Sequence, residues 1–140
     1  MRVLGIDLGS KRIGVAVSDL TGTVASPLRV LNRSKSRRHD HDEIARIVRD
    51  EEVEAIVVGL PLNMDGSRGP AARAATAEAE DIATVTGVPV HLQDERLTTV
   101  TAERALTEAN VRGEERRGVV DKVAAAVLLQ TWLDGRRMSE

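Results

Sequence analysis

The chain has 140 residues, 41% hydrophobic and 30% charged, which is the size and composition of one globular domain, residues 1–140, with a single core. It has no cysteine, which excludes disulfides and thiolate metal sites and favours the reducing cytoplasm, and it has no apolar run suited to a membrane span or a signal sequence. The net charge of −2 excludes a protein that coats nucleic acid nonspecifically, and one Trp with no Phe or Tyr provides no series of aromatic side chains for stacking bases, so a nucleic-acid partner would be held chiefly through its phosphates.

Apolar runs separated by turn residues predict three antiparallel strands at the start of the chain. Val3–Leu8 and Ile13–Val17 are separated by a Gly-Ser-Lys-Arg turn, which predicts a hairpin. A second turn at residues 19–22 leads into a strand that ends at Leu31, and Pro27 places this strand at an edge or at a bulge.

The middle of the chain changes to a helical pattern and then to a strand pattern. From about Asp40 to Glu52, apolar residues recur at helical spacing, and the β-branched run Ala55–Gly59 fits a buried strand. Pro70 at a first turn and Gly87 at the other end bound a second helix. The inner face of this helix is expected to carry Ala71, Ala75, Ala79 and Ile82.

The last third of the chain predicts one more strand and two helices. Val88, Val90 and Leu92 alternate as a fifth strand, and Leu97–Asn110 and Val119–Leu133 have helical patterns. The order is therefore three strands, helix, strand, helix, strand, helix, helix. It predicts an α/β fold in which a five-stranded mixed sheet, three antiparallel strands and then two parallel ones, is flanked by helices.

Residues 32–41 are the most basic segment and have no apolar period, so we expect an exposed or mobile loop there. The segment contains Arg33, Lys35, two consecutive arginines at Arg37 and Arg38, and histidines 39 and 41. It fits either a phosphate-binding arm or a solvated charged connection, and its pattern leaves both interpretations open.

Asp7 is an acid in a strand that is otherwise apolar. Burying an unpaired carboxylate is costly, so a metal ion, a basic partner or a cap on the next turn must offset the cost. Gly5 and Gly9 leave space for a ligand to approach the backbone. These features favour metal or phosphate chemistry over a structural role.

Two further acidic positions have less decisive patterns. Asp121 shares the core-facing stripe of a helix with Ala125 and Leu128, although an acid in an early helical turn is also explained by the helix dipole. Asp94 and Glu95 follow the fifth strand, where parallel sheets often present functional groups. Alternation places these two on opposite faces of the sheet, and periodicity does not choose between them.

Three carboxylates that converge in space suit Mg²⁺ or Mn²⁺, because hard oxygen ligands leave positions open for water and phosphate oxygens. Two such ions, roughly 3.5–4 Å apart, can activate a water and stabilise a leaving oxygen. The three histidines fall in the basic segment and in a strand, which makes a zinc site a poor hypothesis.

Four segments resemble the motifs of the YqgF/RuvX family of the RNase H-like superfamily, in the family's order and near its spacing. They are GIDLGSKRIGVA at residues 5–16, GLPLNMDG at 59–66, DERLTT at 94–99 and DKVAA at 121–125. The resemblance implies an RNase H-like nuclease fold, with Asp7, Glu95 and Asp121 as metal-binding catalytic residues and Mg²⁺ or Mn²⁺ as cofactor. It also implies processing of the 5′ end of precursor 16S rRNA or, as the alternative, cleavage of four-way Holliday junctions.

Other positions within these motifs suggest roles in binding substrate. Lys11 and Arg12 follow Asp7 and suit a phosphate beside the metals. Asn63 and Asp65, with Gly66, suit a substrate-orienting loop, although the same residues are ordinary turn formers. Arg96 suits either a contact to phosphate or an ion pair that orients Glu95.

The expected partner is structured nucleic acid, either precursor rRNA or branched DNA, together with ribosomal precursor particles. No membrane partner is expected, and the protein is a monomer or a homodimer. Two other classes stay open. A nucleotide-binding hairpin like that of sugar kinases and actin-like ATPases is disfavoured because those proteins need a duplicated domain. A catalytically silent RNA-binding ribosome-assembly factor would tolerate Asp7→Ala.

Overall fold

The computed structural model describes residues 1–96 and 113–139, with the backbone alone at 113–119 and 137–139. Its elements, in chain order, are β1 Val3–Leu8, β2 Arg12–Ser18, β3 Ala25–Asn32, α1 Arg37–Asp50, β4 Ala55–Leu60, α2 Pro70–Thr86, β5 Val90–Asp94 and α4 Gly113–Ser139. The described elements follow the predicted order. The helix predicted at Leu97–Asn110 lies outside the described residues.

The five strands form one mixed sheet in the order β3-β2-β1-β4-β5. β1, β2 and β3 pair antiparallel, whereas β4 and β5 pair parallel to β1 and to each other. The prediction of three antiparallel and two parallel strands is confirmed. β3 is an edge strand, and Pro27 lies opposite Ala16, where the register shifts at a bulge, as the proline indicated.

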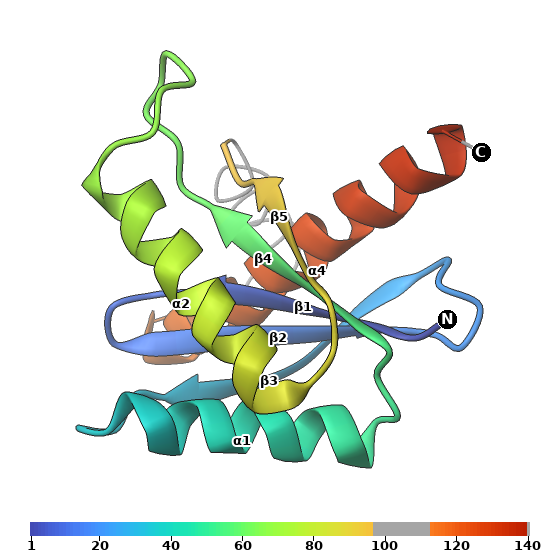
Figure 1. Cartoon of the computed structure of the whole chain (residues 1–140), viewed down its shortest axis with the longest axis horizontal. Coiled ribbons are helices and arrows are strands. Elements are labelled where there is room, and N and C mark those ends of the chain that lie inside the picture. Colours follow the sequence, from blue (N-terminus) through green and yellow to red (C-terminus); the bar gives the residue numbers. More distant parts are fainter. Residues whose placement is uncertain (97–112, 140) are drawn as a thin grey trace.

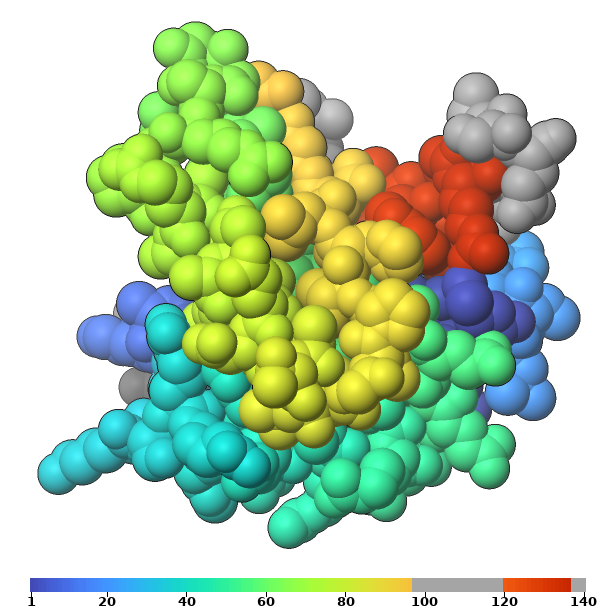
Figure 2. All heavy atoms as spheres, in the orientation of Figure 1, coloured from blue at the N-terminus to red at the C-terminus, as the bar shows by residue number. Residues whose placement is uncertain are grey.

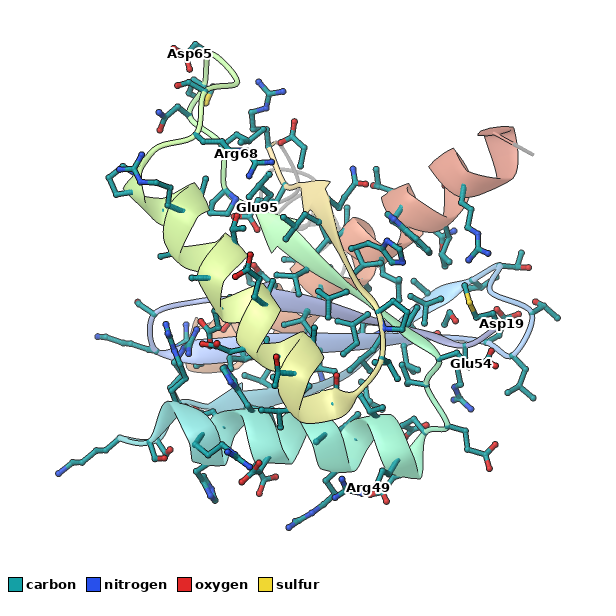
Figure 3. The ribbon with its side chains drawn as sticks, viewed as in Figure 1. Asp19, Arg49, Glu54, Asp65, Arg68 and Glu95 are labelled. Atoms are coloured by element: carbon teal, nitrogen blue, oxygen red, sulfur yellow. The ribbon has the colours of Figure 1, made fainter. Side chains whose placement is uncertain are left out.

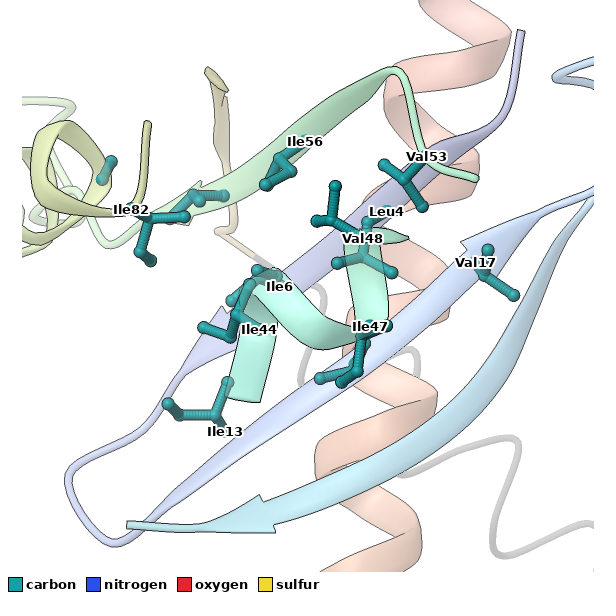
Figure 4. Packing of buried hydrophobic residues seen from close by; sticks show 13 residues of the cluster. Leu4, Ile6, Ile13, Val17, Ile44, Ile47, Val48, Val53, Ile56 and Ile82 are labelled. Carbon is teal, nitrogen blue, oxygen red and sulfur yellow. The ribbon is translucent and has the colours of Figure 1, made fainter. Parts of the chain in front are cut away.

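Helices cover both faces of the sheet: α1 and α2 pack on one face, and α4 crosses the other (Figure 1). Seen from the α1 and α2 side, the atoms of these two helices hide most of the strands (Figure 2). Side chains of β1 point alternately to the two faces of the sheet, so the hydrophobic core consists of two clusters. Leu4 and Ile6 belong to the cluster of isoleucines and valines beneath α1 and α2 (Figure 4). Val3 belongs to a second cluster, against Leu129 of α4. No helix in the described part of the chain is long and apolar enough to span a membrane.

Three details of the predicted helices are wrong. α1 begins at Arg37 rather than near Asp40, because the Ser36 side chain caps it by accepting a hydrogen bond from the His39 backbone N–H. On α2, Ala72 is buried in place of the predicted Ala71. α4 is longer than predicted at both ends.

Candidate active site

Glycines on the sheet allow α4 to pack unusually close to it. Gly5 and Gly14 point toward the helix: a Cβ at Gly14 would collide with the backbone carbonyl of Asp121, and one at Gly5 would lie 2.7 Å from Leu129 Cβ. Gly14 is also the residue that pairs with Asp7 across the β1–β2 hairpin. The close approach therefore brings the backbone of Asp121 beside the strand pair that carries Asp7.

Asp7 lies near the end of β1, on the face of the sheet that α4 covers, since it alternates with Ile6 of the opposite core. Burial raises the pKa of its carboxyl from 3.8 to about 6, and repulsion from the Asp121 carboxylate adds to the effect. The predicted proximity of Asp7 and Asp121 is therefore present in the structure.

Glu95 follows β5, and its backbone N–H donates a hydrogen bond to the Leu60 carbonyl at 3.2 Å. Its side chain lies over Gly59, where any Cβ would collide with the carboxylate, at the end of β4 (Figure 3). Burial raises the pKa of Glu95 to about 7, with smaller contributions from the negative charges of Asp7 and Asp94. Glu95 is therefore the acid of this pair that approaches Asp7.

Asp94 is engaged elsewhere. It accepts hydrogen bonds from the Arg96 backbone and guanidinium, the shortest at 2.6 Å, and these hold the pKa of Asp94 below its usual value. Arg96 also donates to the Met64 carbonyl at 3.4 Å. Arg96 thus connects Asp94 to the loop after β4.

Arg12 is the basic partner of Asp121. Its Nε donates to Asp121 Oδ2 at 2.5 Å, and both side chains are partly exposed. Sequence reasoning assigned Arg12 to a substrate phosphate and missed this pairing, which joins residues 109 positions apart. The neighbouring Lys11 is exposed in the β1–β2 turn.

The loop between β4 and α2 is an exposed turn that extends away from Glu95 (Figure 3). Asp65 accepts hydrogen bonds from the Ser67 backbone and hydroxyl, and Asn63 donates to the same hydroxyl. Gly66 has a φ of +87° and lies next to Arg96. In the structure, Asn63 and Asp65 therefore serve as turn formers, and Arg96 links this loop to Asp94, the residue before Glu95.

The basic segment at residues 32–41 is not the loop that its sequence predicts. Arg33 donates through both terminal nitrogens to Glu78 at 2.8 and 2.9 Å, and His41 Nε2 lies 2.8 Å from the same carboxylate. Glu78 and His41 are buried. Burial opposes ionisation of Glu78, but the hydrogen bonds from Arg33 and His41 hold its pKa below the usual value. The sequence analysis missed Glu78. Its position one helical turn after Ala75 places an acid on the buried face of α2, and this pattern could have indicated a buried ion pair.

This buried network also fixes the turn that follows Asp7. Arg33 Nε donates to the Gly9 carbonyl at 2.7 Å, and the Arg33 backbone N–H donates to the Lys11 carbonyl at 2.9 Å. One side chain therefore joins the β1–β2 turn to α2. The contacts make Arg33 a positioning residue for Lys11 rather than a free phosphate ligand.

Asp7, Glu95 and Asp121 are neighbours, but they do not form a complete metal-binding site. Among residues 1–96 and 113–139, no group of three or more His, Asp or Glu side chains lies close enough together to hold a metal ion. Asp7 is the acid whose charge couples to both others, to Asp121 and to Glu95. The donor set consists only of carboxylate oxygens, which suits Mg²⁺ or Mn²⁺. Burial is the main cause of the raised pKa values of Asp7 and Glu95, and repulsion from neighbouring carboxylates adds to it.

Comparison with known proteins places the chain in a family. The model of the family described as "RuvX: Holliday junction resolvase" matches residues 1–135. A protein of Anaeromyxobacter sp. is 54% identical, with the match covering 97% of this chain and 98% of that protein. A protein of Myxococcus xanthus is 49% identical, with the match covering 98% of this chain and 90% of that protein. Both are named "Putative pre-16S rRNA nuclease".

Among solved structures, RuvC of T. thermophilus in complex with a Holliday junction substrate superposes with a TM-score of 0.63 at 19% identity, covering 99% of this chain and 97% of that one. This likeness shows that the sheet and its helices have the RNase H-like fold of RuvC. The fold and the names of the relatives fit a nuclease, a hydrolase of phosphodiester bonds. The chain belongs to the RuvX family.

Proposed function

We propose that residues 1–140 form one metal-dependent endonuclease domain that hydrolyses phosphodiester bonds at an acidic site composed of Asp7, Glu95 and Asp121. One observation carries the proposal: the fold brings three acids distant in sequence to one end of the same sheet face. Gly14, the pairing partner of Asp7, abuts the Asp121 backbone, and Glu95 lies over Gly59, the residue after the one that pairs with Ile6. Such a concentration of partly buried negative charge costs stability unless cations bind it.

The residues present fit a divalent cation. Asp7, Glu95 and Asp121 offer hard oxygen ligands, and the absence of a side chain at Gly59 leaves room for the Glu95 carboxylate. A bound Mg²⁺ or Mn²⁺ supplies positive charge against phosphate oxygens and lowers the pKa of an attacking water. RuvX membership supports dependence on a divalent metal in general, and Mg²⁺ or Mn²⁺ is our proposal for its identity.

The chain's own groups would orient the metal ligands and the substrate. Burial raises the pKa of Glu95 to about 7 in the metal-free protein, so cation binding near neutral pH would displace a proton from this carboxylate. Arg12 orients the Asp121 carboxylate through their ion pair. Lys11, exposed in the turn that Arg33 holds, is placed to contact a phosphate oxygen next to Asp7.

For the substrate, we propose the 5′ end of precursor 16S rRNA within ribosomal precursor particles in the cytoplasm. The printed names of relatives that are about half identical over nearly the whole chain support this choice. A four-way DNA junction is the second candidate, supported by the description of the family model. Both substrates require the same phosphodiester chemistry, so the acidic site does not separate them.

The test assays purified protein on a precursor-rRNA 5′ end and on a four-way DNA junction, with EDTA and with added Mn²⁺. We expect metal-dependent cleavage of the RNA and its loss in Asp7→Asn and Asp121→Asn. Asp50→Asn, at the exposed end of α1, is the matched control and should cleave normally. Preferential cleavage of the junction would favour the second candidate. Cleavage of neither, with Asp7→Ala functional in cells, would favour a silent assembly factor.

A further inference from the structure

A groove lies between β5 and the C-terminal part of α4, at the opposite end of β5 from Glu95. It has a volume of about 550 Å³, within the range of small-molecule sites, and His91, Gln93, Trp132 and Arg136 are among the residues that line it. Figure 2 shows atoms of the β5 segment (gold), of α4 (red) and of the chain's first residues (dark blue) next to one another there. We call it the Trp132 groove.

The Trp132 groove contains the only Trp of a chain without Phe or Tyr. The indole ring packs partly against the core beneath α4 but stays partly exposed. The His91 ring centroid lies 5.2 Å from it at an interplanar angle of 31°, and the Arg136 guanidinium lies 5.5 Å from the ring centroid. A partly exposed indole flanked by a second ring and a cation is suited to a flat aromatic ring next to a negative charge.

The Trp132 groove and the acidic site share one face of the sheet. In the parallel register, His91 is opposite Val57 and Gln93 is opposite Gly59, so both point toward α4, and Glu95 lies over Gly59 on the same side. Four residues of strand, at about 3.3 Å each, place His91 roughly 13 Å from Glu95 along β5. Within the described residues, no hydrogen bond engages the side-chain amide of Gln93, which lies between them.

We propose that the Trp132 groove binds one unpaired nucleobase of the substrate strand, a few nucleotides from the phosphate at the acidic site. The base stacks on Trp132 in place of the Arg136 guanidinium, which moves off the ring to face the phosphate, while Gln93 and His91 contact the edge of the base. Paired bases are stacked on both faces and do not offer a free one, so the groove selects substrates with an unpaired stretch beside the cut. The inference rests on the proposed nuclease function and narrows its substrate class.

The single Trp makes the test direct, because the intrinsic fluorescence of the protein comes from Trp132. Titrating Asp7→Asn protein, which should not cleave, with a short oligouridylate should quench this fluorescence, whereas a blunt RNA duplex should not. A series of oligonucleotides with one abasic position should lose quenching at one position only. In the binding assay, Trp132→Leu should weaken affinity for the oligouridylate about 10-fold, which corresponds to the loss of about 1.4 kcal/mol of stacking. Thr131→Ala, at the exposed neighbouring position, is the matched control.

Anisotropy of a labelled oligouridylate separates the possible failures. Binding without quenching, or full affinity in Trp132→Leu, overturns the base site and leaves the nuclease proposal intact. If wild-type protein neither binds nor cleaves RNA, both proposals fall. A change of oligomeric state in Trp132→Leu at equal RNA affinity would assign the groove to a second copy of the chain and overturn the base site. Should the leucine variant fail to fold, Trp132→Phe, which keeps a stacking ring, must retain most of the affinity.

Discussion

Replacing Asp7 by asparagine should stabilise the metal-free protein at neutral pH while abolishing cleavage. Burial and the Asp121 charge raise the pKa of Asp7 from 3.8 to about 6. Each unit between the two values is worth about 1.4 kcal/mol, so the ionised carboxylate costs the fold up to about 3 kcal/mol. Solvent screening at this partly exposed side chain reduces the expected gain to about 1–2 kcal/mol.

The expected gain in the free energy of unfolding of Asp7→Asn depends on pH. Between 3.8 and about 6, folded Asp7 retains a proton that the unfolded chain has lost, so wild-type stability falls as the pH rises through this interval. Asparagine does not titrate. The stability difference between the variant and the wild type should therefore be small near pH 4 and reach its full value above about pH 6.

Urea denaturation in EDTA at about pH 5 and about pH 8 measures this difference, which corresponds to roughly 3–10 °C in Tm for a chain of this size. Asp19→Asn is the control, and its effect on stability should have the opposite sign. Hydrogen bonds from Thr21, Thr23 and Val24 lower the pKa of Asp19 to about 2, so its replacement should destabilise the fold equally at both pH values. An Asp7→Asn protein no more stable than wild type at about pH 8, or with a gain independent of pH, would refute the electrostatic reasoning.

Three further outcomes are expected. Glu78→Gln should lower the free energy of unfolding by about 3–5 kcal/mol, because it leaves the partly buried Arg33 without its charged partner. Exposed Glu80→Gln should change this free energy little, and urea denaturation compares the two variants. Gly14→Ala should destabilise the protein and reduce cleavage, because the added Cβ forces α4 away from the sheet. Gly135→Ala is the control and should not destabilise the protein, since a Cβ there meets nothing within 4 Å. Measurements of Tm and of cleavage rate compare the two variants. Lys11→Ala should weaken RNA binding and reduce the salt slope by about one, and an unchanged slope would exclude a phosphate contact.

The sequence predicted the sheet well because local patterns determine its strands. Val3–Leu8 has the predicted limits, and Pro27 lies at an edge bulge, since an apolar run and a missing N–H act within a few residues. The start of α1 was wrong for an equally local reason. Basic residues in a first turn oppose the helix dipole and suggest a loop, but the Ser36 cap and packing of the apolar face outweigh that cost.

Of the acidic site, the sequence indicated the acids but not their partners. Asp7 was selected because it interrupts an apolar strand. The pattern around Asp121 left two interpretations open, and the family resemblance chose Asp121 and preferred Glu95 over Asp94. The Arg12–Asp121 and Arg33–Glu78 pairs were not predictable from periodicity, because each joins residues that only the tertiary fold brings together.

The position of Asp121 on the final helix affects when activity can begin during synthesis. Asp7 of β1 is synthesised before α4, the helix that brings Asp121 against the β1–β2 pair. A growing polypeptide therefore lacks one of the proposed metal ligands until α4 has left the ribosome. If the acidic site works as proposed, nascent copies are unable to cut RNA on the ribosome that is making them.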